Sequence, residues 1–484
     1  MSDTHAETVS FVRGTMLPPA DAPVTERGAI KWLRENLFAG WLNTLLTVAA
    51  LYVIYVTLKA LLPWVMNSVW NAGSLSECRD IVAAAGEGAR GACWAVIRER
   101  WHQYLFGFYP QALYWRPILA FGLLFVALAP VLYYGNRKAE LSMTGGAGLL
   151  VIATLLGLGT PLATLSAIVV LMAALLALAW YAPKKLVWVT VFYAPVCYLL
   201  LWGGSLWFVV AAVAGLGVLA VVFMLLQARI GAPAALGAGL LAAVFWWAYL
   251  DAPAVSLLSS LLPVGLTPVP STQFGGFLLA ITIGVTAISF SLPLGILLAL
   301  GRQSNLLIVK ALSVGFIEFI RGVPLITLLF TASLLLQYFL PPGTNFDIIL
   351  RVIILVTFFA AAYLAEVIRG GLAALPRGQY EAADSLGLDY WQAQRLVILP
   401  QALKISIPGI VSTFIGLFKD TTLVSFVGLM DPLRGVSQIV RADINWKGIY
   451  WEPYIFVGAI FFVMCYGMSR YSMYLEQKLR TDHR

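Results

Sequence analysis

The chain consists of long apolar runs separated by shorter polar stretches. The apolar positions are continuous and lack the period of two typical of membrane β-strands, so the runs predict α-helices. A helix needs roughly 20 apolar residues to cross a bilayer, and most runs approach this length. The twelve helices predicted lie near 41–64, 117–134, two within 144–181 divided at Gly159–Pro161, 186–202, 205–228, 235–250, 276–300, 322–340, 349–369, 404–428 and 453–470.

The composition supports the same fold class. Hydrophobic residues make up 61% of the chain and charged residues 11%, whereas soluble domains contain about 25% charged residues. Because backbone polar groups in lipid must be satisfied inside the spanning segment, we expect an all-α, polytopic transmembrane helical bundle of about twelve helices. Dividing 140–250 into fewer helices, for a total of ten, would leave both termini on the same side.

Basic residues lie at the ends of the predicted helices and gather on one predicted side of the membrane. They are Arg137, Lys138, Lys184, Lys185, Arg229, Arg302, Arg470 and those between Arg369 and Lys404. The net charge of +8 therefore reflects the positive-inside rule and does not indicate nucleic-acid binding. Both termini are expected in the cytoplasm of a multi-pass protein. The N-terminal tail is too long and polar for a signal peptide.

The apolar pattern divides the chain into segments. Residues 1–40 form a cytoplasmic tail, and 41–135 hold two helices joined by a long polar, periplasmic loop. Residues 140–250 supply additional hydrophobic helices, to which the sequence assigns no function. After a Pro/Ser-rich linker over 252–273, residues 275–475 contain the last five helices.

Four cysteines bear on the redox environment. Cys78 and Cys93 share the predicted periplasmic loop, where they either form a disulfide or remain free thiols. Cys197 and Cys465 fall in apolar runs and are expected to be inert packing residues. His5, His102 and His483 are scattered, so no metal site is expected.

The polar segment 376–404 interrupts the predicted core on the side where basic residues gather. Residues from Gln379 to Leu386 favour a helix, Gly387 allows a turn, and 388–398 are amphipathic. Leu399-Pro400 is predicted to end that amphipathic stretch. Ala382 and Ala383 are small, which would let another protein surface approach closely. We interpret the segment as a contact site for a cytoplasmic partner.

No catalytic residues are assigned. The chain contains no Gly-Lys dipeptide and therefore no P-loop lysine. If ATP drives this protein, another subunit must bind it.

The segment resembles the EAA loop of binding-protein-dependent ABC importer permeases. Six positions match the pattern: Glu381, Ala382, Ala383, Gly387, Leu399 and Pro400. Val397 stands where the family usually has Ile. The resemblance implies that a short coupling helix docks in a groove of the cytoplasmic ATPase, that Glu381 makes a polar contact there, and that Gly387 sets the bend.

The resemblance extends over about 275–480, the C-terminal five-helix permease core. Segments 291–305, 316–330, 361–372 and 413–428 look like the polar amino-acid uptake branch, and the length and 468–476 look most like the M-type subunit of general L-amino-acid importers. The partners implied are a cytoplasmic ABC ATPase dimer, a second homologous permease, a periplasmic amino-acid-binding protein and membrane lipid. No cofactor is expected in this chain, since ATP and Mg would bind the ATPase.

Polar residues inside the core are candidates for the translocation path. Lys419 and Asp420 interrupt an apolar run, and each would cost roughly 2.5–3.5 kcal/mol at a bilayer centre. They would either line the path with Thr421 and Thr422, meeting the charged groups of a zwitterion, or tie the helix to another subunit. Gln337 is a weaker candidate.

Two pairs spaced three residues apart are candidates for local ion pairs. These are Glu318 with Arg321 and Glu366 with Arg369.

Three other functions compete with amino-acid import. A permease of the same fold for another small polar solute fits the same loop. An ion-coupled secondary transporter would need internal repeats and midplane ion sites. A membrane scaffold would need no charged residues within a span. Neither of the last two predicts the loop pattern.

Overall fold

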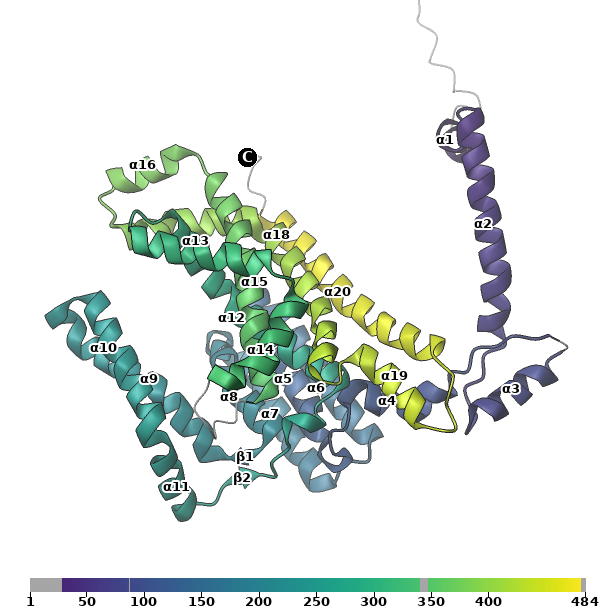
Figure 1. Cartoon of the computed structure of the whole chain (residues 1–484), viewed down its shortest axis with the longest axis horizontal. Helices are drawn as coiled ribbons and strands as arrows, with labels where there is room; N and C mark the ends of the chain where they lie inside the picture. Colours follow the sequence, from purple (N-terminus) through teal and green to yellow (C-terminus); the bar gives the residue numbers. More distant parts are fainter. Residues whose placement is uncertain (1–27, 87, 340–346, 480–484) are drawn as a thin grey trace, which may run out of the picture. The chain divides into compact units, whose positions relative to one another are not determined.

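The computed structural model describes residues 28–86, 88–339 and 347–479. Within these ranges eleven helices are long and apolar enough to cross a membrane, or up to twelve if one bent pair forms a single span. The described chain is almost entirely helical, with one two-residue strand pair, β1 (Gly204–Ser205) against β2 (Gly265–Leu266). The predicted all-α bundle of about twelve spans is therefore confirmed (Figure 1).

The chain divides into two compact units, Met1–Ala95 and Val96–Arg484. The described part of the first contains α1 (Gly28–Asn36), α2 (Trp41–Met66) and α3 (Leu75–Ala84). α2 is apolar on all sides and none of it is buried within the protein, as expected for a helix surrounded by lipid or by other subunits.

The second unit begins with helices that precede the core. They are α4 (Ala95–Phe106), α5 (Trp115–Leu132), α6 (Arg137–Gly157), α7 (Leu162–Tyr181), α8 (Val187–Trp202), α9 (Leu206–Ile230), α10 (Ala232–Phe245) and α11 (Asp251–Leu261). The predicted break at Gly159–Pro161 separates α6 from α7. The predicted linker 252–273 is wrong in its first part, because α11 occupies it. A π-helical turn, η4 (Trp246–Leu250), joins α10 to α11, and its wider spacing accommodates Pro253.

The core contains the remaining helices. They are α12 (Gly276–Gln303), α13 (Leu307–Gly322), α14 (Leu325–Phe339), α15 (Ile348–Ala373), α16 (Arg377–Ser385), α17 (Tyr390–Ala393), α18 (Leu399–Asp420), α19 (Pro432–Ala442) and α20 (Trp451–Leu479). Small residues bring the central helices close together: a Cβ on Gly295 of α12 would lie 2.8 Å from Leu364 Cβ of α15. A Cβ on Gly371 of α15 would lie 2.5 Å from the carbonyl oxygen of Ala402 in α18. Such contacts are typical of helix packing in membranes.

Two predicted core helices have different bounds. The span expected at 322–340 is preceded by a separate amphipathic helix, α13, and α13 is bent by 101° from Leu325–Thr331. Pro324 explains the break, because the residue before a proline avoids helical geometry and Val323 is extended. The helix expected at 404–428 begins earlier and gives way at Thr421–Val427 to a 3₁₀ turn, η7, which ends at Gly428 with a φ of 94°.

The loop predicted over 67–116 is not irregular throughout. α3 and α4 both lie inside it. Each helix is short and polar enough that the apolar pattern did not distinguish it from loop.

Candidate functional site

The first half of the segment 376–404 is a short helix closed by a glycine. α16 ends in a Schellman motif: the amide of Gly387 donates to Asp384 O at 2.9 Å, and that of Leu388 to Ala383 O at 3.3 Å. Gly387 has a φ of +68°, a conformation that side-chain-bearing residues rarely adopt. The predicted helix and the predicted turn are both present.

The second half is a continuous helix running into the bilayer span. Asp389 and Gln392 form a capping box that starts α17, with the Gln392 amide 2.8 Å from Asp389 Oδ1 and the Asp389 amide 3.1 Å from Gln392 Oε1. A π-helical turn, η6 (Gln394–Ile398), then joins α17 to α18. The expected end at Leu399-Pro400 is therefore wrong. Pro400 falls in the first turn after η6, where the wider π spacing accommodates a residue that lacks an amide hydrogen.

The exposed face of this segment, which we call the coupling face, combines one carboxylate with large apolar side chains. Glu381 is exposed, and among the described residues none donates a hydrogen bond or forms an ion pair to its carboxylate. Leu386 is 75% exposed, Trp391 65% and Leu396 63%. Exposed apolar side chains on an otherwise polar segment indicate a protein interface.

One of the paired alanines faces inward. Ala382 is exposed, as expected for close approach of a partner, but Ala383 is buried against the protein. The prediction that both present a small surface to a partner is therefore wrong for Ala383.

The coupling face rests on a hydrophobic cluster that joins it to the spans. Leu375, Ile398 and Ala402 are buried together with residues of α12, α13 and α15. Gln401 Nε2 of α18 also donates to Gln379 Oε1 of α16 at 2.7 Å. Because packed interiors transmit displacement, a push on the coupling face reaches the spanning helices.

Behind the coupling face, Glu366 of α15 forms ion pairs with three arginines on three helices. Arg369 Nε lies 3.0 Å from Glu366 Oε2, and Arg321 Nη1 of α13 lies 3.7 Å from Glu366 Oε1. Arg302 of α12 pairs with the same carboxylate. Arg302 additionally pairs with Glu318 at 3.0 Å. We call these five residues the arginine–glutamate cluster.

The cluster confirms one predicted ion pair and corrects the other. Glu366 pairs with Arg369 as predicted, but Glu318 and Arg321 do not pair with each other in the described structure. Each has a partner on another helix, because the packing of α12, α13 and α15 places Arg302 beside Glu318 and Glu366 beside Arg321. Arg302, which the sequence indicated only as a marker of the cytoplasmic side, joins α12 to both α13 and α15.

The candidate path residues lie where α18 ends. Lys419 is exposed and Asp420 half-buried, and neither side chain has a hydrogen bond or ion pair to another described residue. Thr421 is buried and donates to Phe418 O at 2.7 Å, and Thr422 donates to Lys419 O at 2.9 Å. Both threonine hydroxyls are thus satisfied within their own helix.

The side chain of Gln337 lies outside the described residues, although α14 includes its backbone. Its predicted place in the path stays a prediction.

Cys78 and Cys93 form a disulfide, one of the two states left open by the sequence. Cys197 and Cys465 are free and half-buried. Among the described residues no group of three or more His, Cys, Asp or Glu side chains forms a metal site.

Asp431 is a functional candidate that the sequence did not indicate. Its carboxylate caps α19, accepting from the amides of Leu433 at 2.9 Å and Arg434 at 3.2 Å. Burial raises the pKa of this carboxyl to about 6, although the two amide hydrogen bonds act in the opposite direction. An Asp-Pro pair is a usable sequence signal for such a helix start.

The described structure is thus an apolar helical bundle joined by a buried cluster to an exposed polar segment. Residues 291–481 match the family described as "Binding-protein-dependent transport system inner membrane component". The chain belongs to this family, whose members are transporter components rather than enzymes, and is a multi-pass inner-membrane protein.

Curated relatives match the chain over different lengths. It is 59% identical to the glutamate/glutamine/aspartate/asparagine transport system permease protein BztC of Rhodobacter capsulatus, over 100% of both chains. It is 35% identical to the inner membrane amino-acid ABC transporter permease protein YhdY of Escherichia coli K12, over 96% of both. The glutamate/aspartate import permease protein GltK of Escherichia coli O6:H1 is 32% identical over 43% of this chain and 95% of its own.

Proposed function

We propose that this chain is the amino-acid permease subunit of an ATP-driven importer, coupled through its coupling face to a separate ATPase dimer. The observation that carries the proposal is the combination of an unpaired Glu381 with a buried connection from α16 to the spans. The full-length relatives named for amino-acid transport favour amino acids as substrate, and the 59% identical relative favours acidic amino acids and their amides. A second, homologous permease and a substrate-binding protein complete the assembly.

The same proposal includes an orientation and a path. The coupling face and both termini lie in the cytoplasm, and the Cys78–Cys93 disulfide lies in the oxidising periplasm. Lys419, Asp420, Thr421 and Thr422 contribute to the path, with Gln337 on α14. No cofactor binds this chain; ATP and Mg bind the ATPase.

The decisive experiment reverses the charge of Glu381. Uptake of radiolabelled glutamate into vesicles containing the whole transporter is measured for Glu381→Lys and for Asp80→Lys, which makes the same charge change on α3. We expect Glu381→Lys to abolish uptake while assembly and insertion remain normal, because a charged hydrogen bond to the ATPase, worth about 1.5–3 kcal/mol, becomes a repulsion. Asp80→Lys should transport normally. Full uptake by Glu381→Lys, or uptake by the purified chain without any ATPase, would contradict the proposal.

A further inference from the structure

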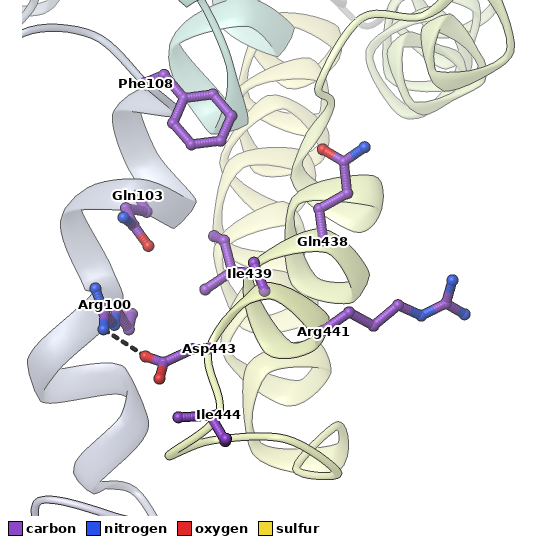
Figure 2. A pocket seen from close by; sticks show the side chains of 9 residues that line it. Arg100, Gln103, Phe108, Gln438, Ile439, Arg441, Asp443 and Ile444 are labelled. Atoms are coloured by element: carbon purple, nitrogen blue, oxygen red, sulfur yellow. Dashed lines mark hydrogen bonds and ion pairs between the residues drawn. The ribbon is translucent and has the colours of Figure 1, made fainter.

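A groove of about 790 Å³ opens between α4 and α19 in the second unit (Figure 2). Arg100, Gln103 and Phe108 line it from α4 and the residues just after it. Gln438, Arg441 and Ile444 line it from α19 and the residues that follow. The groove is therefore shared between a helix of the N-terminal part and a helix of the matched family region 291–481.

The two walls of the groove are fixed to each other. Arg100 forms an ion pair with Asp443, and Trp446 Nε1 donates to Glu99 Oε2 at 2.9 Å. After α4 the backbones meet so closely that a Cβ on Gly107 would lie 2.4 Å from the Cα of Gly275. A preformed surface loses little conformational entropy when it binds a partner.

The groove lies at the opposite end of the bundle from the coupling face. The amide of Gly276, at the start of α12, donates to Met430 O at 2.8 Å just before α19. Arg302, at the other end of α12, belongs to the arginine–glutamate cluster behind the coupling face. A helix of this length spans roughly 40 Å, about the full thickness of a bilayer. Figure 1 shows α16 and α19 at opposite ends of this bundle.

The charge left exposed at the groove is positive. The acidic groups beside it already have partners: Asp443 pairs with Arg100, Glu99 accepts from Trp446, and Asp431 caps α19. Arg441 is exposed, and none of the described residues gives its guanidinium a hydrogen bond or ion pair.

Two large apolar side chains also line the groove. Phe108 is 58% exposed and Ile444 is 88% exposed. Arginine beside exposed aromatic and aliphatic side chains is the composition of protein–protein contact sites, where Arg and aromatic residues are enriched.

We propose that the α4–α19 groove is a docking surface for the substrate-binding protein, receiving an acidic patch of that protein. Arg441 pairs with a carboxylate of the partner, and Phe108 and Ile444 cover apolar groups next to it. The inference rests on the proposed function, which requires such a partner.

The test measures ATP hydrolysis by the complete transporter in lipid nanodiscs against increasing concentrations of its liganded binding protein. The variants are Arg441→Glu, Arg441→Gln and Phe108→Ser. Lys184→Glu, which changes an exposed basic residue in the 3₁₀ turn just before α8, is the matched control. We expect the half-saturating concentration to rise about tenfold in Arg441→Glu and less in Arg441→Gln, with an unchanged maximal rate. The salt dependence of half-saturation should weaken in Arg441→Gln, and Lys184→Glu should titrate as the wild type.

The outcomes separate this inference from the proposed function. A wild-type transporter that the binding protein does not stimulate would contradict the proposed function itself. A stimulated wild type whose Arg441 and Phe108 variants keep the same half-saturation would overturn the groove alone. So would a lower maximal rate at unchanged half-saturation, or an effect seen only when the anionic lipid content of the nanodisc is changed, which would indicate a lipid headgroup as the occupant.

Discussion

Within the arginine–glutamate cluster, a conservative substitution of Glu366 should lower the stability of the protein most. The side chain of Glu366 is 17% exposed and forms ion pairs with arginines of α12, α13 and α15. Glu366→Gln keeps the shape of the side chain and removes its charge. Removing one partner of a fully buried pair costs about 3–5 kcal/mol, and an exposed pair is worth about 0–1 kcal/mol. For this largely buried group with three partners we expect Glu366→Gln to lower the free energy of unfolding by about 2–4 kcal/mol.

Glu318→Gln is the matched control, because it removes the same charge from the same cluster. Glu318 is 54% exposed and, among the described residues, forms an ion pair with Arg302 alone, and Arg302 keeps Glu366 as a partner. Glu318→Gln should therefore lower the free energy of unfolding by less than about 1 kcal/mol.

The assay is thermal unfolding of the purified transporter in mild detergent, followed by tryptophan fluorescence at one fixed heating rate. Unfolding of large membrane assemblies is commonly irreversible, so apparent midpoints are compared only between variants. Glu366→Gln should lower the midpoint by several degrees more than Glu318→Gln. Equal shifts of the thermal midpoint in the two variants would show that charge alone, and not burial and the number of partners, decides how much each glutamate stabilises the protein.

Three further predictions follow from single residues. Gly387→Ala should speed amide hydrogen exchange in α16, because a left-handed conformation costs a side-chain-bearing residue about 1–2 kcal/mol, whereas Gly378→Ala inside the same helix should slow it; equal effects would contradict this reasoning. Asp431→Asn keeps the helix cap and removes the titrating carboxyl. The thermal midpoint of the wild type should exceed that of the variant most below pH 3.8, the ordinary pKa, and this difference should fall as the pH rises through about 6. A difference in midpoint that does not change with pH would contradict the raised pKa of Asp431. Mass spectrometry after thiol alkylation should label Cys78 and Cys93 only after reduction, and labelling without reductant would contradict the disulfide.

Local features of the fold were predictable because their causes lie close together in the sequence. The α16 helix, the turn at Gly387 and the break at Gly159–Pro161 each depend on a few consecutive residues. The sequence did not indicate α13 because it is amphipathic and carries Lys310 and Arg321, so it lacks the apolar continuity of a span.

Features that depend on distant residues were not predictable. One partner of Arg302, Glu366, lies 64 residues away on another helix. Spacing along one helix therefore indicated that Glu318 would pair locally, whereas packing of α12 against α13 gave it a different partner. Pro400 was taken as a stop because the π-helical turn that accommodates it has no distinct sequence signal.

The unbroken run from α17 through η6 to α18 has a mechanical consequence. Residues 390–420 form one rod, roughly 45 Å long, with Trp391 near one end and Lys419 near the other. Tilting such a rod by about 5° swings its far tip by about 4 Å, a distance larger than a hydrogen bond. A tilt that begins at the Trp391 end would therefore displace the Lys419 end without any hinge loop in between.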